Sequence, residues 1–416
     1  MLDLDCALEF FADFDADFFS ALPARPGIFL LEMRAPGAQP YLARTADIRR
    51  AAERLLSQPE SASKALNLRE VAGRIRYRVT GSKFEQTFAF YENARALFPS
   101  RYRDLMRLRP PAMLKVNLRN AYPRCYVTRQ IRGDEGFYFG PFATRRLAED
   151  FSEGFLDLFK TRRCQIKIRR DPEYPGCMYS EMKMCLAPCF AGCTKEEYDV
   201  EVGRVLQTLE SSGASLTEEL ARERAAASDA LDFERAAALH KRLDKVSAAL
   251  RAMPDVARRV EELDVVILQR SAEPQTIAVF PVRGGLLAEP LFLRFADISS
   301  EPRSVEAILR EKLEREVEPG ADTAAPEALS PAPPPPQRNS ASSEGSADWR
   351  SRYGLRSAPP QLPEHLSLIA RWFYSKPRDG EILFRDKVWP YRRMLRACSR
   401  LLSSPQEARI PPRPAQ

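Results

Sequence analysis

The sequence contains no uninterrupted apolar run of roughly 18 residues, the length that a membrane-spanning helix requires. Its apolar beginning, ALEFFADFDADFFSAL, has no basic flank and is interrupted by Asp13, Asp15 and Asp17, which excludes a secretory signal peptide. Cysteine is scarce outside one short stretch, so a disulfide-stabilised secreted domain is not expected. These absences predict a cytoplasmic protein with reduced thiols and no membrane attachment.

The charge balance shows only a small excess of basic residues, with 64 Lys and Arg against 57 Asp and Glu and a formal net charge of +7. The basic residues cluster in TRRCQIKIRR (161–170) and over residues 101–132, where tyrosines lie between the arginines. This pattern suits a polyanionic partner such as DNA, and it also suits a solvated protein surface.

The cysteines are concentrated in one segment that also contains PGCMYSEMKMCLAPCFAGC. Five of the eight lie there: Cys164, Cys177, Cys185, Cys189 and Cys193. Thiolates this close in sequence favour one shared soft metal or an iron–sulfur cluster, and a single helical turn would direct Cys185 and Cys189 to the same centre. The alternative is a buried group of free thiols that pack as small apolar side chains.

Local patterns predict an N-terminal β-hairpin over residues 26–45, helices over 47–56 and 84–98, a second hairpin that joins 122–131 to 137–142, and a helix over 144–160. Residues 195–250 are expected to be helical. Their last part carries an apolar seam at spacings of three and four residues: Ala236, Leu239, Leu243, Val246 and Leu250. This seam either packs within a helical hairpin that turns near Asp229 or docks onto another protein.

The motifs YFGPF (138–142), MCLAPC (184–189) and LDFERAAALHKRLDKV (231–246) occur in this order around the cysteines. In this combination the chain resembles the UvrC family, the incision subunits of bacterial nucleotide excision repair, over roughly residues 22–296. The resemblance implies an α+β multidomain protein. The expected parts are a GIY-YIG-like nuclease domain (22–110), a Cys-rich cluster module (111–195), a UVR-type helical hairpin (196–252), a truncated RNase H-like antiparallel β region (260–316), a disordered linker (318–362) and a helical tail (363–416).

The resemblance assigns nuclease roles to residues of the first domain. Tyr41 and Arg44 match the tyrosine of the second motif strand and the basic residue that follows it. Glu85 or Glu92 matches the glutamate that binds metal, with Glu92 the preferred Mg²⁺ ligand; the two share a helix face. The sequence alone does not choose between them.

Three other motif positions depart from the family. Phe29 replaces the tyrosine that activates the attacking water, Ala43 replaces the motif glycine, and Ala51 stands where an arginine is expected. Cleavage of this type needs an activated water, a divalent ion and a cation for the developing charge. The departures therefore predict a silent or very slow nuclease.

The resemblance also implies a [4Fe–4S] cluster on Cys164, Cys177, Cys185 and Cys189, with zinc as the alternative. It implies that the hairpin binds a UvrB-like protein, through Phe233 and Leu239 as anchors and Leu243 as a further contact. Glu234 and Arg235 are expected at the rim of this contact. The second nuclease of the family is not expected, because no strand after Phe295 carries the acidic residues that its metals need.

The expected function is a UvrC-like, DNA-binding and UvrB-binding repair subunit whose endonuclease is degenerate. Three alternatives stay open: an active nuclease that uses other residues of the same pocket, a non-catalytic adaptor that competes for UvrB, and a metal- or redox-sensing DNA-binding regulator.

Overall fold

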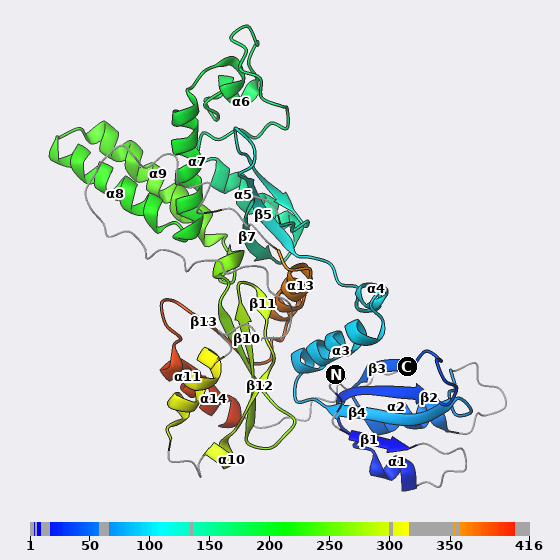
Figure 1. The fold of residues 1–416 in the computed structure, drawn as a ribbon. Helices are drawn as coiled ribbons and strands as arrows, with labels where there is room; N and C mark the ends of the chain where they lie inside the picture. The colour runs from blue at the N-terminus through cyan, green and yellow to red at the C-terminus, as the bar shows by residue number, and fades with distance from the viewer. Residues whose placement is uncertain are drawn as a thin grey trace, which may run out of the picture.

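The computed structural model describes residues 4, 6–9, 17–57, 66–133, 136–298, 303–315, 353 and 358–403. These residues form an α+β protein with three antiparallel sheets and flanking helices (Figure 1). Within this part of the chain, no helix combines the length and the apolar character that crossing a bilayer demands. The expected linker 318–362 lies outside the described residues, apart from Tyr353 and residues 358–362.

The first sheet has the strand order β1-β4-β2-β3. Its strands are β1 (Cys6–Glu9), β2 (Gly27–Met33), β3 (Tyr41–Thr45) and β4 (Ala72–Val79). β2 and β3 pair in antiparallel register, as expected for the first hairpin. Helices α1 (Asp17–Ala21) and α2 (Ile48–Leu56) pack on one face, and α2 begins after Asp47, whose carboxylate accepts the Arg50 N–H at 3.0 Å.

The other face of this sheet is covered by α3 (Lys83–Leu97). The Gln86 side chain fixes the helix to the sheet, because its Nε2 donates to the carbonyls of Gly27 at 2.9 Å and Thr45 at 2.7 Å. A short helix, α4 (Tyr102–Met106), follows α3 and contacts it. The first domain is therefore a small sheet between helices.

The second sheet has the order β6-β5-β7-β8. Its strands are β5 (Ala112–Asn117), β6 (Cys125–Thr128), β7 (Gly136–Phe142) and β8 (Arg258–Arg259). The expected hairpin between 122–131 and 137–142 is wrong, because β5 lies between β6 and β7 and pairs with both. The strand was missed because Lys115 interrupts its apolar pattern; this lysine is buried, with its Nζ 4.9 Å from the centre of the Tyr138 ring.

Helices continue from the second sheet. In chain order they are α5 (Arg145–Leu156), α6 (Met178–Glu181), the 3₁₀ turn η1 (Pro188–Phe190), α7 (Lys195–Glu210), α8 (Ala214–Asp229) and α9 (Phe233–Arg251). α8 and α9 form the expected hairpin, which projects from the molecule in Figure 1. Its base joins the same apolar core as α5 and the second sheet.

The third sheet has the order β11-β10-β9-β13, with β12 also paired to β10. Its strands are β9 (Val265–Arg270), β10 (Thr276–Arg283), β11 (Leu286–Leu287), β12 (Leu291–Arg294) and β13 (Glu381–Phe384). The remaining elements are η2 (Val260–Glu262), α10 (Phe295–Ile298), α11 (Val305–Arg315), α13 (Leu362–Phe373) and α14 (Tyr391–Ser403).

The expectation of a helical tail needs a correction at β13. This strand comes from the tail and pairs with β9 in antiparallel register, with Glu381 opposite Leu268 and Phe384 opposite Val265. The β region is therefore completed by the tail, and α13 and α14 pack on it.

Tyr353 is one further anchor for the C-terminal part of the chain. Its side chain is buried in the core of the second sheet, and its hydroxyl donates to Glu210 Oε2 at 2.6 Å. Its ring meets the Phe137 ring edge to face at 5.8 Å.

Candidate functional site

Four of the positions compared with the nuclease motif share one face of the first sheet. Phe29, Tyr41, Ala43 and Ala51 belong to the apolar cluster between the sheet and α2. Phe29 is only 1% exposed, and its ring lies 6.2 Å from that of Tyr41. Among these four residues only Tyr41 has a polar side chain, and Phe29 offers no hydroxyl to accept a proton from water. Tyr77, which pairs with Phe29 across β2 and β4, packs against the same cluster.

Arg44 points to the opposite face of the sheet, since successive side chains of a strand alternate. Its Nη1 donates to Thr87 Oγ1 at 3.5 Å, and its guanidinium lies 5.7 Å from the centre of the Phe90 ring on α3. Tyr41 and Arg44 are therefore not brought together. The arginines of α2 have other roles, because Arg49 Nε donates to the Leu22 carbonyl at 2.8 Å and Arg50 pairs with Asp47 at 3.5 Å.

Glu85 is buried at the beginning of α3, with 2% exposure. Its Oε2 accepts the Gly81 N–H at 2.8 Å, and its Oε1 lies 3.9 Å from Arg78 Nη2. Burial lowers the pKa of Arg78, an effect that Glu85 opposes. This carboxylate therefore stabilises the turn between β4 and α3.

Glu92 lies farther along α3 and pairs with Arg95 at 3.8 Å. Burial raises the pKa of the Glu92 carboxyl; Arg95 opposes the rise, and the negative charge of Glu364 on α13 adds to it. Glu92 therefore lies near the tail helix. The structure does not assemble Tyr41, Arg44 and Glu92 into one centre.

Glu364 is a prominent carboxylate that sequence reasoning missed. It is 4% exposed and accepts hydrogen bonds from Tyr91 Oη at 2.6 Å, Tyr102 Oη at 2.7 Å and Arg103 Nε at 2.6 Å. Burial alone would raise its pKa, but these hydrogen bonds outweigh burial and lower it. Glu364 thereby fixes α13 to α3 and α4, and no local pattern in LPEHLSLIARWF (362–373) signals this contact.

The cysteine module lies beyond the second sheet, between α5 and α7 (Figure 1). Buried Arg162 fastens its first loop, because its guanidinium donates to the carbonyls of Tyr122 and Ile166, both at 2.8 Å, and lies 3.8 Å from Cys164 Sγ. The expected helical turn from Cys185 to Cys189 is absent, since Ala187 between them has a left-handed backbone with φ of 57°.

The four predicted cluster ligands share one neighbourhood. Burial raises the pKa of Cys185 to about 11, although a hydrogen bond from the Ala187 N–H lowers it. The nearby thiols of Cys164, Cys177 and Cys189 add to the rise. Thiolates are suitable donors for zinc or an iron–sulfur cluster. However, the described residues include no group of three or more His, Cys, Asp or Glu side chains placed to hold a metal ion. Four thiols are the right kind of ligand for zinc or an iron–sulfur cluster, but their sulfur atoms would have to move closer together to bind a metal.

The predicted docking residues of the helical hairpin fall into two groups, one buried and one exposed. Leu239 is buried and Leu243 partly buried against the core, as an internal seam requires. Phe233 is 68% exposed and Leu231 72% exposed at the α8–α9 turn, and Glu234 beside them is also exposed. The free apolar surface is at the tip of the hairpin rather than along its seam.

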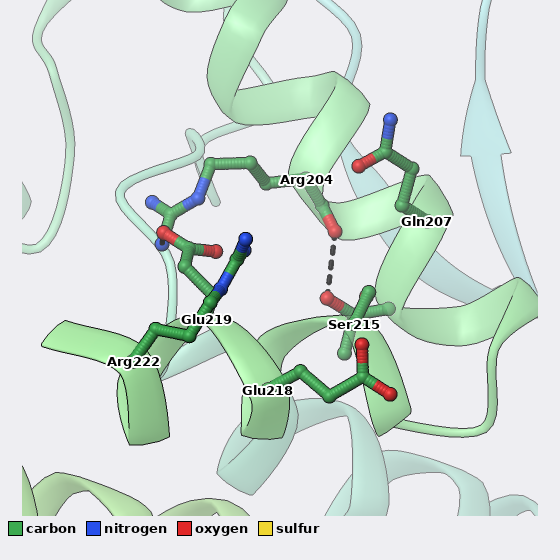
Figure 2. Close-up of a pocket in the computed structure, with 7 residues that line it drawn as sticks. Arg204, Gln207, Ser215, Glu218, Glu219 and Arg222 are labelled. Atoms are coloured by element: carbon green, nitrogen blue, oxygen red, sulfur yellow. Dashed lines mark hydrogen bonds and ion pairs between the residues drawn. The ribbon is translucent and has the colours of Figure 1, made fainter. Parts of the chain in front are cut away.

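A polar cavity of about 220 Å³ lies between α7 and α8. Figure 2 shows Arg204 and Glu219 extending toward one another across it. Its lining residues are Arg204, Gln207, Thr208, Ser215, Glu218, Glu219 and Arg222. Arg204 pairs with Glu201 at 2.8 Å and Glu219 at 2.9 Å, so its charge is balanced locally. None of the residues predicted for chemistry lines this cavity.

Comparison with known proteins identifies the relatives. A family model described as the middle domain of UvrC/Cho excinucleases matches residues 112–208. Proteins named UvrABC system protein C also match. The one from Dehalococcoides mccartyi is 27% identical over 274 residues, covering 64% of this chain and 44% of the relative. Those from Carboxydothermus hydrogenoformans and Moorella thermoacetica are 28% and 26% identical, covering 65% and 71% of this chain and 44% and 48% of the relatives.

This chain is a divergent relative of the UvrC family. It spans less than half of the length of these UvrC relatives. The region matched by the family model contains β5 to β7, α5, the cysteine module and most of α7. No solved structure matches the chain significantly.

Proposed function

We propose that this chain is a UvrC-like accessory subunit of nucleotide excision repair that binds DNA without cutting it. The observation that carries this proposal is the nuclease-like face of the first sheet, where Phe29 is buried among Ala43 and Ala51. The loss of a proton acceptor or of a charge-stabilising donor each typically costs ~10²–10³ in rate. Arg44 and Glu92 do not compensate, because they face other parts of the molecule.

The four cysteines are proposed to hold a [4Fe–4S] cluster, with zinc as the alternative. The group would supply a structural tie between the basic segment 161–170 and α7. Cys164, Cys177, Cys185 and Cys189 would be its ligands, which the shared neighbourhood of their thiols supports. Absorbance spectra and metal analysis of anaerobically purified protein test this. Protein that is free of metal and equally stable would contradict it.

A UvrB-like protein is the proposed partner of the helical hairpin. Exposed Phe233 supports this, because a large apolar side chain at a projecting tip has no role in the core. A binding assay with UvrB should show binding that Phe233→Ala weakens, while Phe233→Ala leaves the melting temperature unchanged. The same surface would serve a non-catalytic adaptor that competes for UvrB, which a competition assay against full-length UvrC tests directly.

The decisive experiment for the proposed function combines DNA binding with nicking of damaged duplex DNA in Mg²⁺. We expect salt-dependent binding and no nicking above background, by the native chain or by Tyr41→Phe. Nicking at an ordinary enzymatic rate that Tyr41→Phe or Glu92→Ala abolishes would overturn the non-cleaving assignment. No DNA binding at low salt would overturn the function as a whole.

A further inference from the structure

Three arginines from separate segments meet where the C-terminal helix α13 joins the first domain. Arg44 lies on β3, Arg109 follows α4, and Arg371 is near the end of α13. All three side chains are solvent-exposed. We refer to Arg44, Arg109 and Arg371 as the arginine cluster.

The position of Arg371 is fixed by two sets of contacts. Glu364, two helical turns earlier on the same face of α13, is held by Tyr91, Tyr102 and Arg103. Arg371 Nη1 then donates to the Met106 carbonyl at 2.9 Å, and its Nη2 donates to the carbonyl of Arg107. Arg371 is thus fastened directly beside the segment that carries Arg109.

Packing beneath the cluster holds the other two arginines near α13. Leu42 and Phe90, which flank the Arg44 side chain, pack against the same apolar core as the buried face of α13. Leu108, adjacent to Arg109, packs against this core as well. One core therefore supports all three segments, and the guanidinium groups lie along its rim.

The cluster carries a net positive charge. The pKa of Arg371 is lowered by burial and then by the positive charges of Arg44 and Arg109. In the part of the chain that the structure describes, Arg44 donates to a hydroxyl and Arg371 to backbone carbonyls, and neither forms an ion pair with a carboxylate. An anion would relieve this repulsion.

We propose that the arginine cluster is a binding site for the phosphate backbone of nucleic acid that α13 completes. The inference rests on the proposed DNA-binding function and assigns it to particular residues. Exposed guanidinium groups on separate elements suit a polymer with repeated phosphates better than a small anion, which needs an enclosed cradle. In this site Arg44 of the nuclease-like sheet would bind phosphate together with Arg109 and Arg371, two arginines that lie outside the nuclease motif.

The test measures the affinity of the full chain for short duplex and single-stranded DNA across salt concentrations from about 50 to 200 mM. Arg109→Gln and Arg371→Gln should each weaken binding roughly fivefold to tenfold and lower the slope of log affinity against log salt by about 1. Arg396→Gln is the matched control, because Arg396 is an exposed tail arginine on α14. Arg109 makes no hydrogen bond to the other described residues, so Arg109→Gln keeps the test valid if Arg371→Gln lowers stability.

The outcomes separate this inference from the proposed function. If the native chain does not bind DNA, the proposed function fails and the cluster assignment fails with it. If the native chain binds but Arg109→Gln and Arg371→Gln behave like Arg396→Gln, the cluster assignment is wrong while DNA binding stands. A selective loss of affinity and salt slope in the two cluster variants supports the assignment.

Discussion

Replacing Glu364 with leucine removes the carboxylate that fixes α13 to the first domain. The hydroxyls of Tyr91 and Tyr102 are then left buried without their acceptor, at about 1–3 kcal/mol for each unsatisfied group. Arg103 is 60% exposed, so its ion pair contributes little. We therefore expect Glu364→Leu to destabilise the α13 contact by about 2–6 kcal/mol, the sum for the two tyrosine hydroxyls.

Native-state hydrogen exchange measures this effect, because it reports the opening free energy of α13 separately from the rest of the chain. Glu381→Gln is the control, since Glu381 is also in the tail but pairs with Arg400 at the surface, where a salt bridge contributes about 0–1 kcal/mol. Glu364→Gln, which keeps one acceptor oxygen, should fall between the two. If Glu364→Leu changed the opening of α13 by no more than Glu381→Gln does, the hydrogen-bond network would not be what holds this helix.

Three further predictions concern stability. Burial lowers the pKa of His365 to about 4, so below pH 6.5 the unfolded chain binds a proton more readily than the folded chain. The free energy of unfolding should therefore fall by about 3 kcal/mol as the pH drops from about 6.5 to 4. Denaturation curves measured across this pH range should show the loss in the native chain, and His365→Asn should not show it. Val246→Ala should lower the free energy of unfolding in urea by about 2–3 kcal/mol, because Val246 is fully buried within the hairpin seam; an unchanged value would refute internal packing of the seam. Gly81→Ala should lower the melting temperature, because the added Cβ would lie 2.1 Å from the Ser271 carbonyl carbon. Gly154→Ala should raise the melting temperature slightly, because alanine favours the helix α5 and no atom lies within 4 Å of its Cβ.

The sequence predicts well those elements whose signals are local. The predicted helix over 47–56 is α2, the hairpin of β2 and β3 has the predicted partners, and the spacing of Leu239 and Val246 correctly places both on the inner side of α9. In each case the side chains that determine the structure lie within a few residues of one another, so propensity and periodicity suffice.

Features that depend on distant partners could not be predicted in this way. β13 is only four residues long, and its strand identity comes from pairing with β9, more than a hundred residues earlier. The carboxylate of Glu364 finds its tyrosines on α3 and α4 only after the tail has folded back. The cysteine spacing suggested a helical turn, but it carries no information on the left-handed backbone at Ala187 that prevents one.

The candidate nuclease site shows the same limit. The sequence identified Phe29 and Ala51 as departures from the motif, and their burial in one cluster agrees with that comparison. Alternation along β3 already separates Tyr41 and Arg44 onto opposite faces, but the sequence did not reveal that α3 covers the face of Arg44 and brings Phe90 beside it.

The pairing of β9 with β13 has a consequence for how the protein is made. During synthesis, β9 emerges from the ribosome more than a hundred residues before β13 and keeps one edge unpaired until Glu381–Phe384 are translated. That edge is a run of valine, isoleucine and leucine, a sequence prone to associate with other nascent chains or with chaperones. A stop codon introduced upstream of Glu381 would make this exposure permanent, so truncated products should be cleared or aggregate rather than accumulate as a smaller folded protein.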